Sequence, residues 1–227
     1  MKPQDLVIPC SWQERCPMLF KKFFYIPIQY SGYENFKLPL WSEIFANDYP
    51  ICVEYCSGNG QWIIEKAIQN PQMNWIAVEK KFERARKIWV KAQNNGLNNI
   101  FIVFGEAEVF TKYYLSSDII TSCHINFPDP WPKRRHKQNR LIKREFLEDL
   151  SRVMMINGKV TITSDDELCL TNILQEFDIS GHWQNTTNGL QLIEDLEAFG
   201  LSYFAVLWRN KGRQLKYLTF MKLTCHS

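Results

Sequence analysis

The sequence predicts an α/β fold built on a doubly wound, mostly parallel sheet with an antiparallel edge strand. Three observations support this prediction. From Pro50 onward, short apolar runs alternate with amphipathic stretches, and the links between them are short. The chain has 227 residues, of which 45% are hydrophobic, which is enough for one core. We therefore expect residues 38–227 to form a single domain.

The N-terminal segment has a different texture from the rest of the chain. Residues 1–37 contain several prolines and show no clear hydrophobic period, so we expect an irregular arm. The chain start lacks the apolar run of a signal peptide. No stretch of about 18 apolar residues follows anywhere, and we expect no membrane segment.

The first half of the domain predicts strands that alternate with helices. Each strand is a short apolar run, and each helix has apolar residues three or four positions apart. In order, we expect a strand at Ile51–Tyr55, a turn of small residues, a helix through Ile63, Ile64 and Ala67, a strand at Asn74–Val78, a helix from Phe82 to Asn95 ended by Gly96, and a strand at Ile100–Phe104.

The second half continues the alternation and ends on the antiparallel strand. In order, we expect a strand within Asp118–Phe127, a helix over Leu141–Met155 stopped by Asn157 and Gly158, a strand at Lys159–Thr163, a helix capped by Asp165 or Asp166, and the edge strand at Leu215–Leu223 after a turn at Gly212. In such a sheet, ligands bind at the carboxyl ends of the parallel strands.

The composition does not indicate a metal or a disulfide. Seven cysteines are scattered along the chain, and no pair has the two-residue spacing of a zinc site. We interpret them as reduced thiols of a cytoplasmic protein and expect no metal. The net charge of +3 is too small to identify a binding partner, and nothing indicates an obligatory protein partner.

Small residues follow the first strand. Gly58 and Gly60 lie in the turn Glu54–Gly60, where backbone amides and a helix N-terminus can approach a carboxylate or a phosphate. A dinucleotide is one candidate ligand, but its motif requires a third glycine where Ile63 stands. An ordinary tight turn is the other interpretation.

Acidic residues follow the next two strands. Glu79 ends the second strand, where a carboxylate can accept both hydroxyls of a ribose. Glu106 follows the third strand and can accept a hydrogen bond from an adenine amino group. One glutamate alone would be interpreted as a solvated surface residue. Three such features on three successive strand ends together indicate an adenosine without phosphates.

The end of the fourth strand carries the densest signal. Asp129 lies between Pro128 and Pro130, which predict a rigid, extended loop. Phe127 and Trp131 flank it, and they either stack on a base or simply pack. An uninterrupted basic run follows, containing Lys133, Arg134, Arg135, Lys137, Arg140, Lys143 and Arg144. A basic run is often a solvated helix face, but beside this loop it indicates phosphate binding.

The run Pro128-Asp129-Pro130-Trp131-Pro132-Lys133-Arg134-Arg135-His136 resembles the signature of bacterial tRNA (guanine-N7-)-methyltransferases. The resemblance extends from about Pro50 to Leu223. It implies a Rossmann-like class I methyltransferase fold, S-adenosylmethionine as cofactor and tRNA as substrate. It further implies that the product is N7-methylguanosine at guanine 46, in the variable loop.

The resemblance also implies roles for individual residues. The cofactor site would be lined by Glu54, Gly58, Gly60, Glu79, Glu106 and Asp129, with Asp129 also catalytic. The substrate-binding positions would be Lys133, Asp165, Ser202, Tyr203, Phe204 and Ala205. The residues that contact RNA would be Arg135, His136, Lys137, Gln138, Asn139 and Arg140.

Four positions depart from the pattern of this family. Cys56 replaces the first glycine of Gly-x-Gly-x-Gly and brings a larger side chain to the methionine end of the site. Glu106 replaces an aspartate, and Ser164-Asp165 replaces Thr-Asp. Ala205 replaces the glutamate of Thr-x-Phe-Glu, which removes one acceptor for the guanine edge.

The chemistry of guanine N7 suits these residues. N7 has a lone pair and no proton, so methyl transfer requires orientation rather than a general base. Positive charge develops on the purine, and the Asp129 carboxylate can stabilise it. Asp165 is expected at the guanine edge, or as a helix cap.

Two alternatives remain open at this point. Methylation of an exocyclic amino group is one, since residues 126–131 loosely resemble the Asn/Asp-Pro-Pro-aromatic motif. A non-catalytic RNA-binding protein that has kept the fold is the other, and the departures at Cys56 and Ala205 keep it open.

Overall fold

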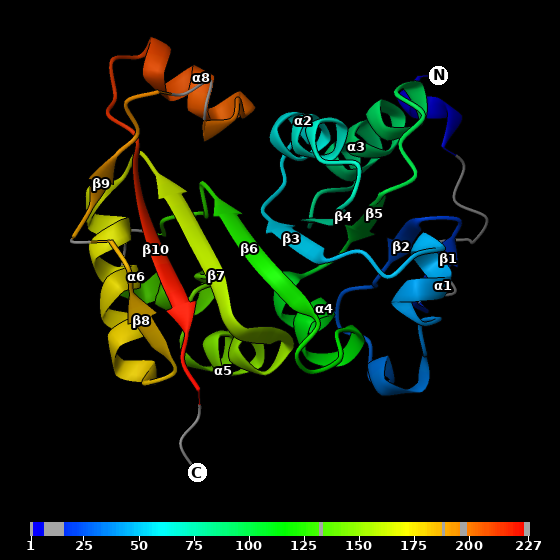
Figure 1. Cartoon of the computed structure of the whole chain (residues 1–227), viewed down its shortest axis with the longest axis horizontal. Helices are drawn as coiled ribbons and strands as arrows, with labels where there is room; N and C mark the ends of the chain where they lie inside the picture. The colour runs from blue at the N-terminus through cyan, green and yellow to red at the C-terminus, as the bar shows by residue number, and fades with distance from the viewer. Residues whose placement is uncertain (1, 7–15, 132–133, 188, 196–198, 225–227) are drawn as a thin grey trace. The chain divides into compact units, whose positions relative to one another are not determined.

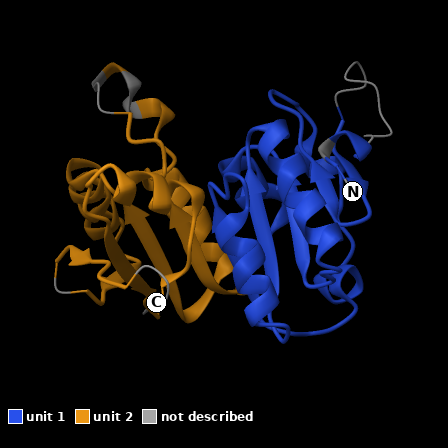
Figure 2. Ribbon diagram, turned by 90° about the horizontal axis from the view of Figure 1, so that it is seen from above, with its two compact units in different colours: residues 1–115 blue, residues 116–227 orange. Residues whose placement is uncertain are grey.

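The structure is a computed structural model that describes residues 2–6, 16–131, 134–187, 189–195 and 199–224. The chain divides into two compact units, residues 1–115 and residues 116–227 (Figure 2). The segment 1–37, expected as an arm, belongs to the first unit. Each unit contains strands of a sheet together with helices (Figure 1).

The strands of the first unit follow the order β1-β2-β5-β4-β3. Strands β2, β5, β4 and β3 run parallel to their neighbours, and β1 is antiparallel to β2. The strands are β1 (Met18–Phe20), β2 (Phe23–Tyr25), β3 (Ile51–Tyr55), β4 (Asn74–Glu79) and β5 (Ile100–Phe104). The helices are η1 (Pro3–Asp5), η2 (Tyr33–Asn35), α1 (Trp41–Phe45), α2 (Gln61–Gln69), α3 (Phe82–Asn94) and α4 (Ala107–Tyr114).

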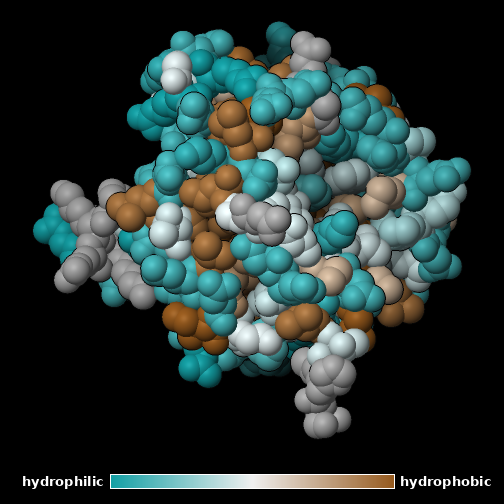
Figure 3. Space-filling view, turned by 60° about the vertical axis from the view of Figure 1, so that its left-hand side comes forward, coloured by the Kyte–Doolittle hydropathy of each residue, from teal (hydrophilic) through white to brown (hydrophobic). Residues whose placement is uncertain are grey.

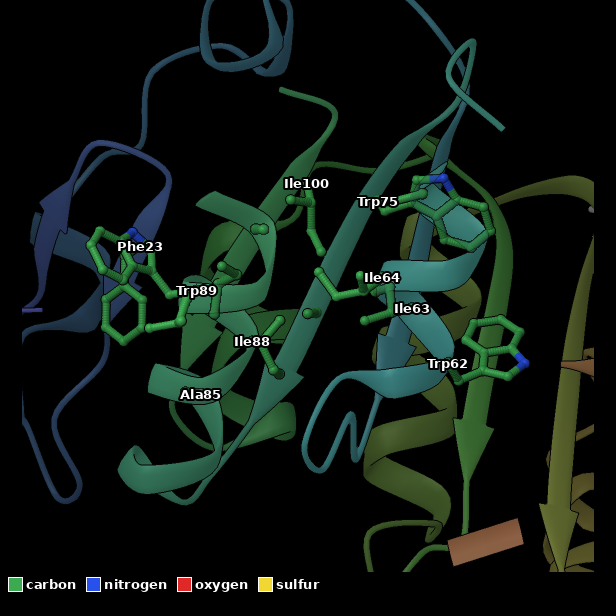
Figure 4. Packing of buried hydrophobic residues seen from close by; sticks show 14 of the residues in the cluster. Phe23, Trp62, Ile63, Ile64, Trp75, Ala85, Ile88, Trp89 and Ile100 are labelled. Atoms are coloured by element: carbon green, nitrogen blue, oxygen red, sulfur yellow. The ribbon is translucent and has the colours of Figure 1, made fainter. Parts of the chain in front are cut away.

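The core of the first unit confirms the strands and helices predicted for this half. Every residue of β3 and β4 is buried, as expected for continuous apolar runs in a parallel sheet. Ala85, Ile88 and Trp89 of helix α3 pack in the same core (Figure 4). The rings of Trp62 in α2 and Trp75 in β4 lie 6.0 Å apart and nearly perpendicular. These large side chains fix α2 and α3 on the sheet.

Residues 18–25, expected to be irregular, form a β-hairpin instead. Strand β2 of this hairpin extends the sheet by pairing in parallel with β5. Phe24 is fully buried, and its ring lies within 6.4 Å of the rings of Phe36, Phe101 and Tyr114. A strand of three residues buried on both faces shows no period of two, so the hydrophobic pattern did not reveal it.

The described strands of the second unit follow the order β6-β7-β10-β8, and β9 also pairs with β10. Strands β6 and β7 are parallel, whereas β10 is antiparallel to β7. The strands are β6 (Ile120–Asn126), β7 (Met154–Ser164), β8 (Trp183–Asn185), β9 (Gln191–Leu192) and β10 (Lys216–Lys222). The helices are η3 (Arg134–Asn139), α5 (Arg144–Val153), α6 (Glu167–Ser180) and α8 (Tyr203–Asn210).

The expected helix stop at Asn157 and Gly158 is wrong. Helix α5 ends at Val153, and β7 begins at once with Met154 and runs through both residues. Asn157 has a φ of 63°, and the register between β6 and β7 shifts beside it. The Asn-Gly pair is therefore an irregularity within a strand. The apolar run from Val153 to Ile156 fits a helix end and a strand start equally well, so the pattern could not separate them.

The antiparallel strand predicted near the C-terminus is β10. It pairs with β7 over six residues, from Lys216 to Met221. Its other side is covered over three residues by β8, which the sequence did not predict. The ring of Phe220 in β10 stacks on Phe177 of α6 with centroids 3.8 Å apart, and both side chains are buried. This contact packs α6 against the strands β7, β10 and β8 (Figure 1).

The described surface offers few special features. Across the described ranges, no helix is both long and apolar enough to cross a bilayer, and no three metal-binding side chains gather. Cys52 and Cys123 are buried thiols, whereas Cys10 and Cys225 lie outside the described residues. Figure 3 shows apolar groups set among polar ones on the face it presents. Exposed apolar residues are common on the surfaces of folded proteins.

Candidate functional site

The turn after β3 is a tight loop with glycine at two positions that favour it. Gly58 and Gly60 have φ values of 56° and 71°, in the left-handed region that favours glycine. A Cβ at Gly60 would lie 2.6 Å from Cγ1 of Ile88 in α3, which is closer than atoms can approach. The Ser57 hydroxyl donates to the Glu54 carbonyl at 2.9 Å and closes the turn. The predicted small-residue loop is thus confirmed, and it packs tightly on α3.

The Glu79 carboxylate joins this loop to the end of β4. Its Oε2 accepts the Gly58 N–H at 2.8 Å, and its Oε1 accepts the Lys81 N–H at 2.9 Å. Glu79 is 4% exposed, and burial raises its pKa. The two N–H groups, together with the positive charge of Arg84, oppose this increase of the pKa. The structure therefore brings the predicted cofactor residues Gly58 and Glu79 into direct contact.

Glu54 and Glu106, the other acidic cofactor residues predicted in this unit, also lie at strand ends. Glu54 is the penultimate residue of β3 and is 1% exposed. Glu106 follows β5 as the N-cap of α4 and is partly exposed. The Gly105 N–H donates to the Glu79 carbonyl at 3.2 Å, so the chain leading into Glu106 lies beside the end of β4.

A cavity of about 380 Å³ opens beside Glu106. Its lining includes Lys80, Phe104 and Gly105, which follow from the predicted strand ends. The remaining lining residues are Tyr25, Ile26, Pro27, Ile28 and Gln29. This last group was not predicted from the sequence, because residues 1–37 were expected to form an irregular arm. Only the apolar run Phe23–Tyr25 could have indicated a strand there.

In the second unit, Asp129 projects from a loop with two unusual backbone conformations. Phe127 and Trp131 have φ values of 52° and 39°, which side-chain-bearing residues rarely adopt. The Phe127 N–H donates to the Thr163 carbonyl at 2.9 Å and so ties the loop to β7. Asp129 itself is exposed. The predicted rigid loop is present, with a sharp backbone bend at each side of Pro128–Pro130.

Arg140 closes the same loop from its far end. Its Nε and Nη2 donate to the Trp131 carbonyl at 3.3 and 3.1 Å. Arg140 and Asp129 also line a small hollow of about 20 Å³ together with Cys169 of α6. Burial raises the pKa of the Cys169 thiol to about 11, so it is protonated at neutral pH. The predicted RNA contact Arg140 therefore holds the loop, and Cys169 is not an activated nucleophile.

The remaining residues of the predicted RNA contact form helix η3. The side chains of Arg135, Gln138 and Asn139 are exposed there. Lys133, predicted to bind substrate, lies outside the described residues, as do the side chains of His136 and Lys137. The described side chains of η3 named here thus present one cation and two amides to solvent.

The structure shows which of Asp165 and Asp166 caps the helix that follows β7. Asp166 caps α6, and its Oδ1 accepts the Cys169 N–H at 2.9 Å. Asp165 instead forms an ion pair with Arg213, whose guanidinium lies 4.2 Å above the Trp208 ring. The carboxylate predicted to bind substrate is therefore held at the turn that follows α8.

Residues 202–205, also predicted to bind substrate, form the start of α8. Ser202 is the N-cap, and its Oγ accepts the Ala205 N–H at 3.0 Å. Tyr203 is 49% exposed, and the Phe204 ring lies 6.2 Å from the ring of Phe127. Ala205 is buried in an apolar cluster, against which Phe127 also packs. Phe127, which could have stacked on a base, therefore has a packing role.

The chain is similar to known proteins over most of its length. Residues 48–218 match a protein family described as "Putative methyltransferase". The chain is 42% identical to the tRNA (guanine-N(7)-)-methyltransferase of Chlamydia muridarum and 43% identical to that of Chlamydia trachomatis. Each match covers 98% of both chains. A tRNA (guanine-N(7)-)-methyltransferase of Clostridioides difficile is 39% identical over 56% of this chain and 59% of its own length.

Solved structures resemble the fold. The crystal structure of the 16S rRNA methyltransferase KamB has a TM-score of 0.60 at 16% identity and covers 80% of this chain and 92% of its own. A 16S rRNA (adenine(1408)-N(1))-methyltransferase from Catenulisporales acidiphilia, solved with S-adenosylmethionine, has a TM-score of 0.59 at 15% identity. It covers 84% of this chain and 95% of its own. The predicted class I methyltransferase fold is thereby confirmed.

The loop geometry predicts that Cys56→Gly stabilises the protein. Cys56 has a φ of 61°, a conformation that costs a residue with a side chain about 1–2 kcal/mol. The greater freedom of glycine in the unfolded chain offsets part of this gain. We expect the free energy of unfolding, measured with urea, to increase by about 1 kcal/mol.

The matched variant Gly60→Ala should act in the opposite direction. It combines a φ of 71° with the close approach of Ile88, so it should lower the free energy of unfolding. Equal stability of the Cys56→Gly variant and the unmodified protein would contradict the proposed cost at residue 56.

Proposed function

This chain belongs to the family of tRNA (guanine-N(7)-)-methyltransferases, and we propose that its target is guanine 46, in the variable loop of tRNA. The enzyme moves the methyl group of S-adenosylmethionine to N7 of a tRNA guanine. The match over 98% of both chains to relatives with this activity is the observation that carries the assignment. The choice of guanine 46 is supported by the resemblance of the Asp129 loop to the bacterial family. Because the substrate is tRNA, we place the enzyme in the cytoplasm.

The reaction is a direct displacement at carbon. The N7 lone pair forms the new bond to the methyl carbon, and the bond between that carbon and the sulfonium sulfur breaks. S-adenosylhomocysteine leaves, and the positive charge moves from sulfur to the guanine ring. No proton is removed from N7, so the protein must align the reactants and stabilise charge on the purine.

We assign the first unit to the cofactor. Glu79 would accept the ribose hydroxyls, because its two observed hydrogen bonds use only part of the acceptor capacity of a carboxylate. The loop with Gly58 and Gly60 would lie at the methionine end, close to Glu54, because glycine lets a ligand approach the backbone closely. Glu106 would accept from the adenine amino group, because it lines the cavity at the end of β5.

We assign the second unit to the guanine. Asp129 would stabilise the charge that develops on the purine, because it is exposed on a loop with a fixed backbone. Asp165 would accept from the guanine edge through the oxygen that Arg213 leaves available. Tyr203 supplies an exposed aromatic ring at the start of α8. Ala205 is buried and supplies no polar group.

We assign helix η3 and its flanks to the RNA backbone. Arg135 is exposed there and can neutralise a phosphate, and Gln138 and Asn139 can donate hydrogen bonds. Lys133, His136 and Lys137 belong to the same proposed contact through the family resemblance. Access to N7 within folded RNA would require partial extrusion of the nucleotide, held by these contacts.

The assignment is tested by mapping the methylated base. Undermodified bulk tRNA is incubated with the enzyme and methyl-labelled cofactor, then treated with borohydride and aniline, which cleave RNA at N7-methylguanosine. We expect label incorporation and one new cleavage site, at guanine 46. Cleavage at another guanine would contradict the position, and label without cleavage would indicate methylation of an exocyclic amino group.

Replacement of Asp129 should separate catalysis from RNA binding. We expect Asp129→Ala to lower kcat by at least about 100-fold, the loss typical when a group that stabilises transition-state charge is removed. The tRNA Kd, measured by filter binding, should change little, since a carboxylate does not attract phosphate. Asp178→Ala, which removes an exposed carboxylate from α6, is the matched control and should retain full activity. Normal turnover by the Asp129 variant would remove this residue from the mechanism.

Arg140 and Arg135 should give opposite kinetic signatures. Arg140→Ala removes both hydrogen bonds to the Trp131 carbonyl, so we expect kcat at saturating tRNA to fall about tenfold, with a smaller change in the tRNA Kd. Arg135→Ala should raise the Kd and reduce its dependence on salt, with kcat retained.

Arg140→Lys refines this comparison. A lysine keeps the charge but cannot make both bonds, so its kcat should stay below that of the unmodified enzyme. If Arg140→Ala changed only the Kd and its salt dependence, Arg140 would act as a phosphate contact and not by positioning the loop.

A further inference from the structure

We infer that residues 26–29 of the N-terminal segment form one wall of the adenine pocket, and that Ile28 provides the apolar surface on which the base lies. The inference rests on the proposed assignment of Glu106 to the adenine amino group. It gives the segment before the predicted domain a role in selecting the cofactor.

Residues 26–29 follow β2 and lie beside the end of β5. Strand β2 pairs in parallel with β5, with Tyr25 opposite Phe104, so both strands end at the same edge of the sheet (Figure 1). The Ile26 N–H donates to the Phe104 carbonyl at 2.9 Å and continues the pairing by one residue. The chain from Pro27 to Gln29 therefore emerges beside Gly105, where β5 leads into Glu106.

This wall is fixed at its start. The Tyr25 ring stacks on the Phe104 ring with centroids 5.3 Å apart. A Cβ at Gly105 would lie 2.7 Å from the Cβ of Ile26, so only glycine permits this approach. Ile26 is 2% exposed. The start of the segment is held against the strand end by a hydrogen bond, a ring stack and the close packing of Ile26 on Gly105.

The cavity beside this segment has the size and the chemical groups that adenine requires. The cavity of about 380 Å³ lies within the range of small-molecule pockets, about 300–1,000 Å³. Glu106 and Lys80 supply polar groups to its lining, whereas Ile28 supplies a large apolar side chain that is 63% exposed. Adenine matches this combination, since it has two apolar faces and an amino donor on its edge. Binding of the base would cover the exposed part of Ile28.

The test compares variants of this wall with variants of its polar partner. We would measure the Kd of S-adenosylhomocysteine by calorimetry, because this product carries the same nucleoside and does not react. Ile28→Ala should raise the Kd about five- to tenfold, the factor expected when most of an isoleucine side chain no longer covers the ligand. Ile28→Val should restore most of the affinity. Ile179→Ala, at an apolar α6 residue that is 75% exposed, is the matched control and should leave the Kd unchanged.

Further measurements test the role of Ile28 separately from the assignment of Glu106 to the adenine amino group. The Ile28 variants should keep the tRNA Kd and the unfolding midpoint of the ligand-free protein, because the side chain is largely exposed. If Glu106→Ala weakens binding while Ile28→Ala does not, the wall is overturned and the assignment of Glu106 stands. If neither variant weakens binding, the cavity is not the adenine pocket. A lower unfolding midpoint for Ile28→Ala, with an unchanged Kd, would show that the residue is structural.

Discussion

The proposed cofactor half of the site depends on one hydrogen bond, from the Gly58 N–H to the Glu79 carboxylate. A carboxylate that is 4% exposed is costly unless donors replace water, and here two backbone N–H groups do so. Gly58 presents its N–H from a left-handed conformation, which glycine adopts without steric cost. The bond that satisfies Glu79 thus also fixes the loop after β3. A shift of that loop would leave one oxygen of a buried carboxylate without this donor, so the hydrogen bond favours the loop conformation before any ligand binds.

The Asp129 loop of the second unit is held by hydrogen bonds at residues that are not glycine. Phe127 and Trp131 occupy left-handed conformations without being glycine, at a cost of order 1–3 kcal/mol each. Each bend is held by hydrogen bonds: the Phe127 N–H donates to the Thr163 carbonyl, and the Arg140 guanidinium donates twice to the Trp131 carbonyl. A hydrogen bond from a charged donor contributes about 1.5–3 kcal/mol, enough to offset the bend at Trp131. Asp129 therefore keeps its place although it is exposed.

The comparison of sequence and structure shows which features have a local signal. Strands β3 and β5 were predicted to the residue, because each is an apolar run bounded by turn residues. Gly58 and Glu79 were expected in one site because strand ends meet at one edge of a sheet, but the hydrogen bond between them was not predicted. Strand β2 and the wall it leads into were missed, because its pairing with β5 joins residues about 80 positions apart. The bonds of Arg140 to the Trp131 carbonyl were missed as well, since a guanidinium near a loop has the same sequence signature whether it binds RNA or backbone.

The loss of the family's glutamate at Ala205 has a structural explanation that the sequence alone did not provide. Ser202 is the N-cap of α8, and Ala205 is the third residue of that helix, so the family's Thr-x-Phe-Glu has the spacing of a capping box. In such a box the hydroxyl binds the N–H of the third residue, and the glutamate returns to the N–H of the cap. This chain keeps the first bond, from the Ala205 N–H to the Ser202 Oγ at 3.0 Å, and uses the vacated position to extend an apolar cluster with Ile193 and Leu215. Helix α8 therefore begins where the family pattern requires, without the glutamate. Because a buried methyl group accepts no hydrogen bond, recognition of the guanine edge in the proposed reaction rests on Asp129 and Asp165.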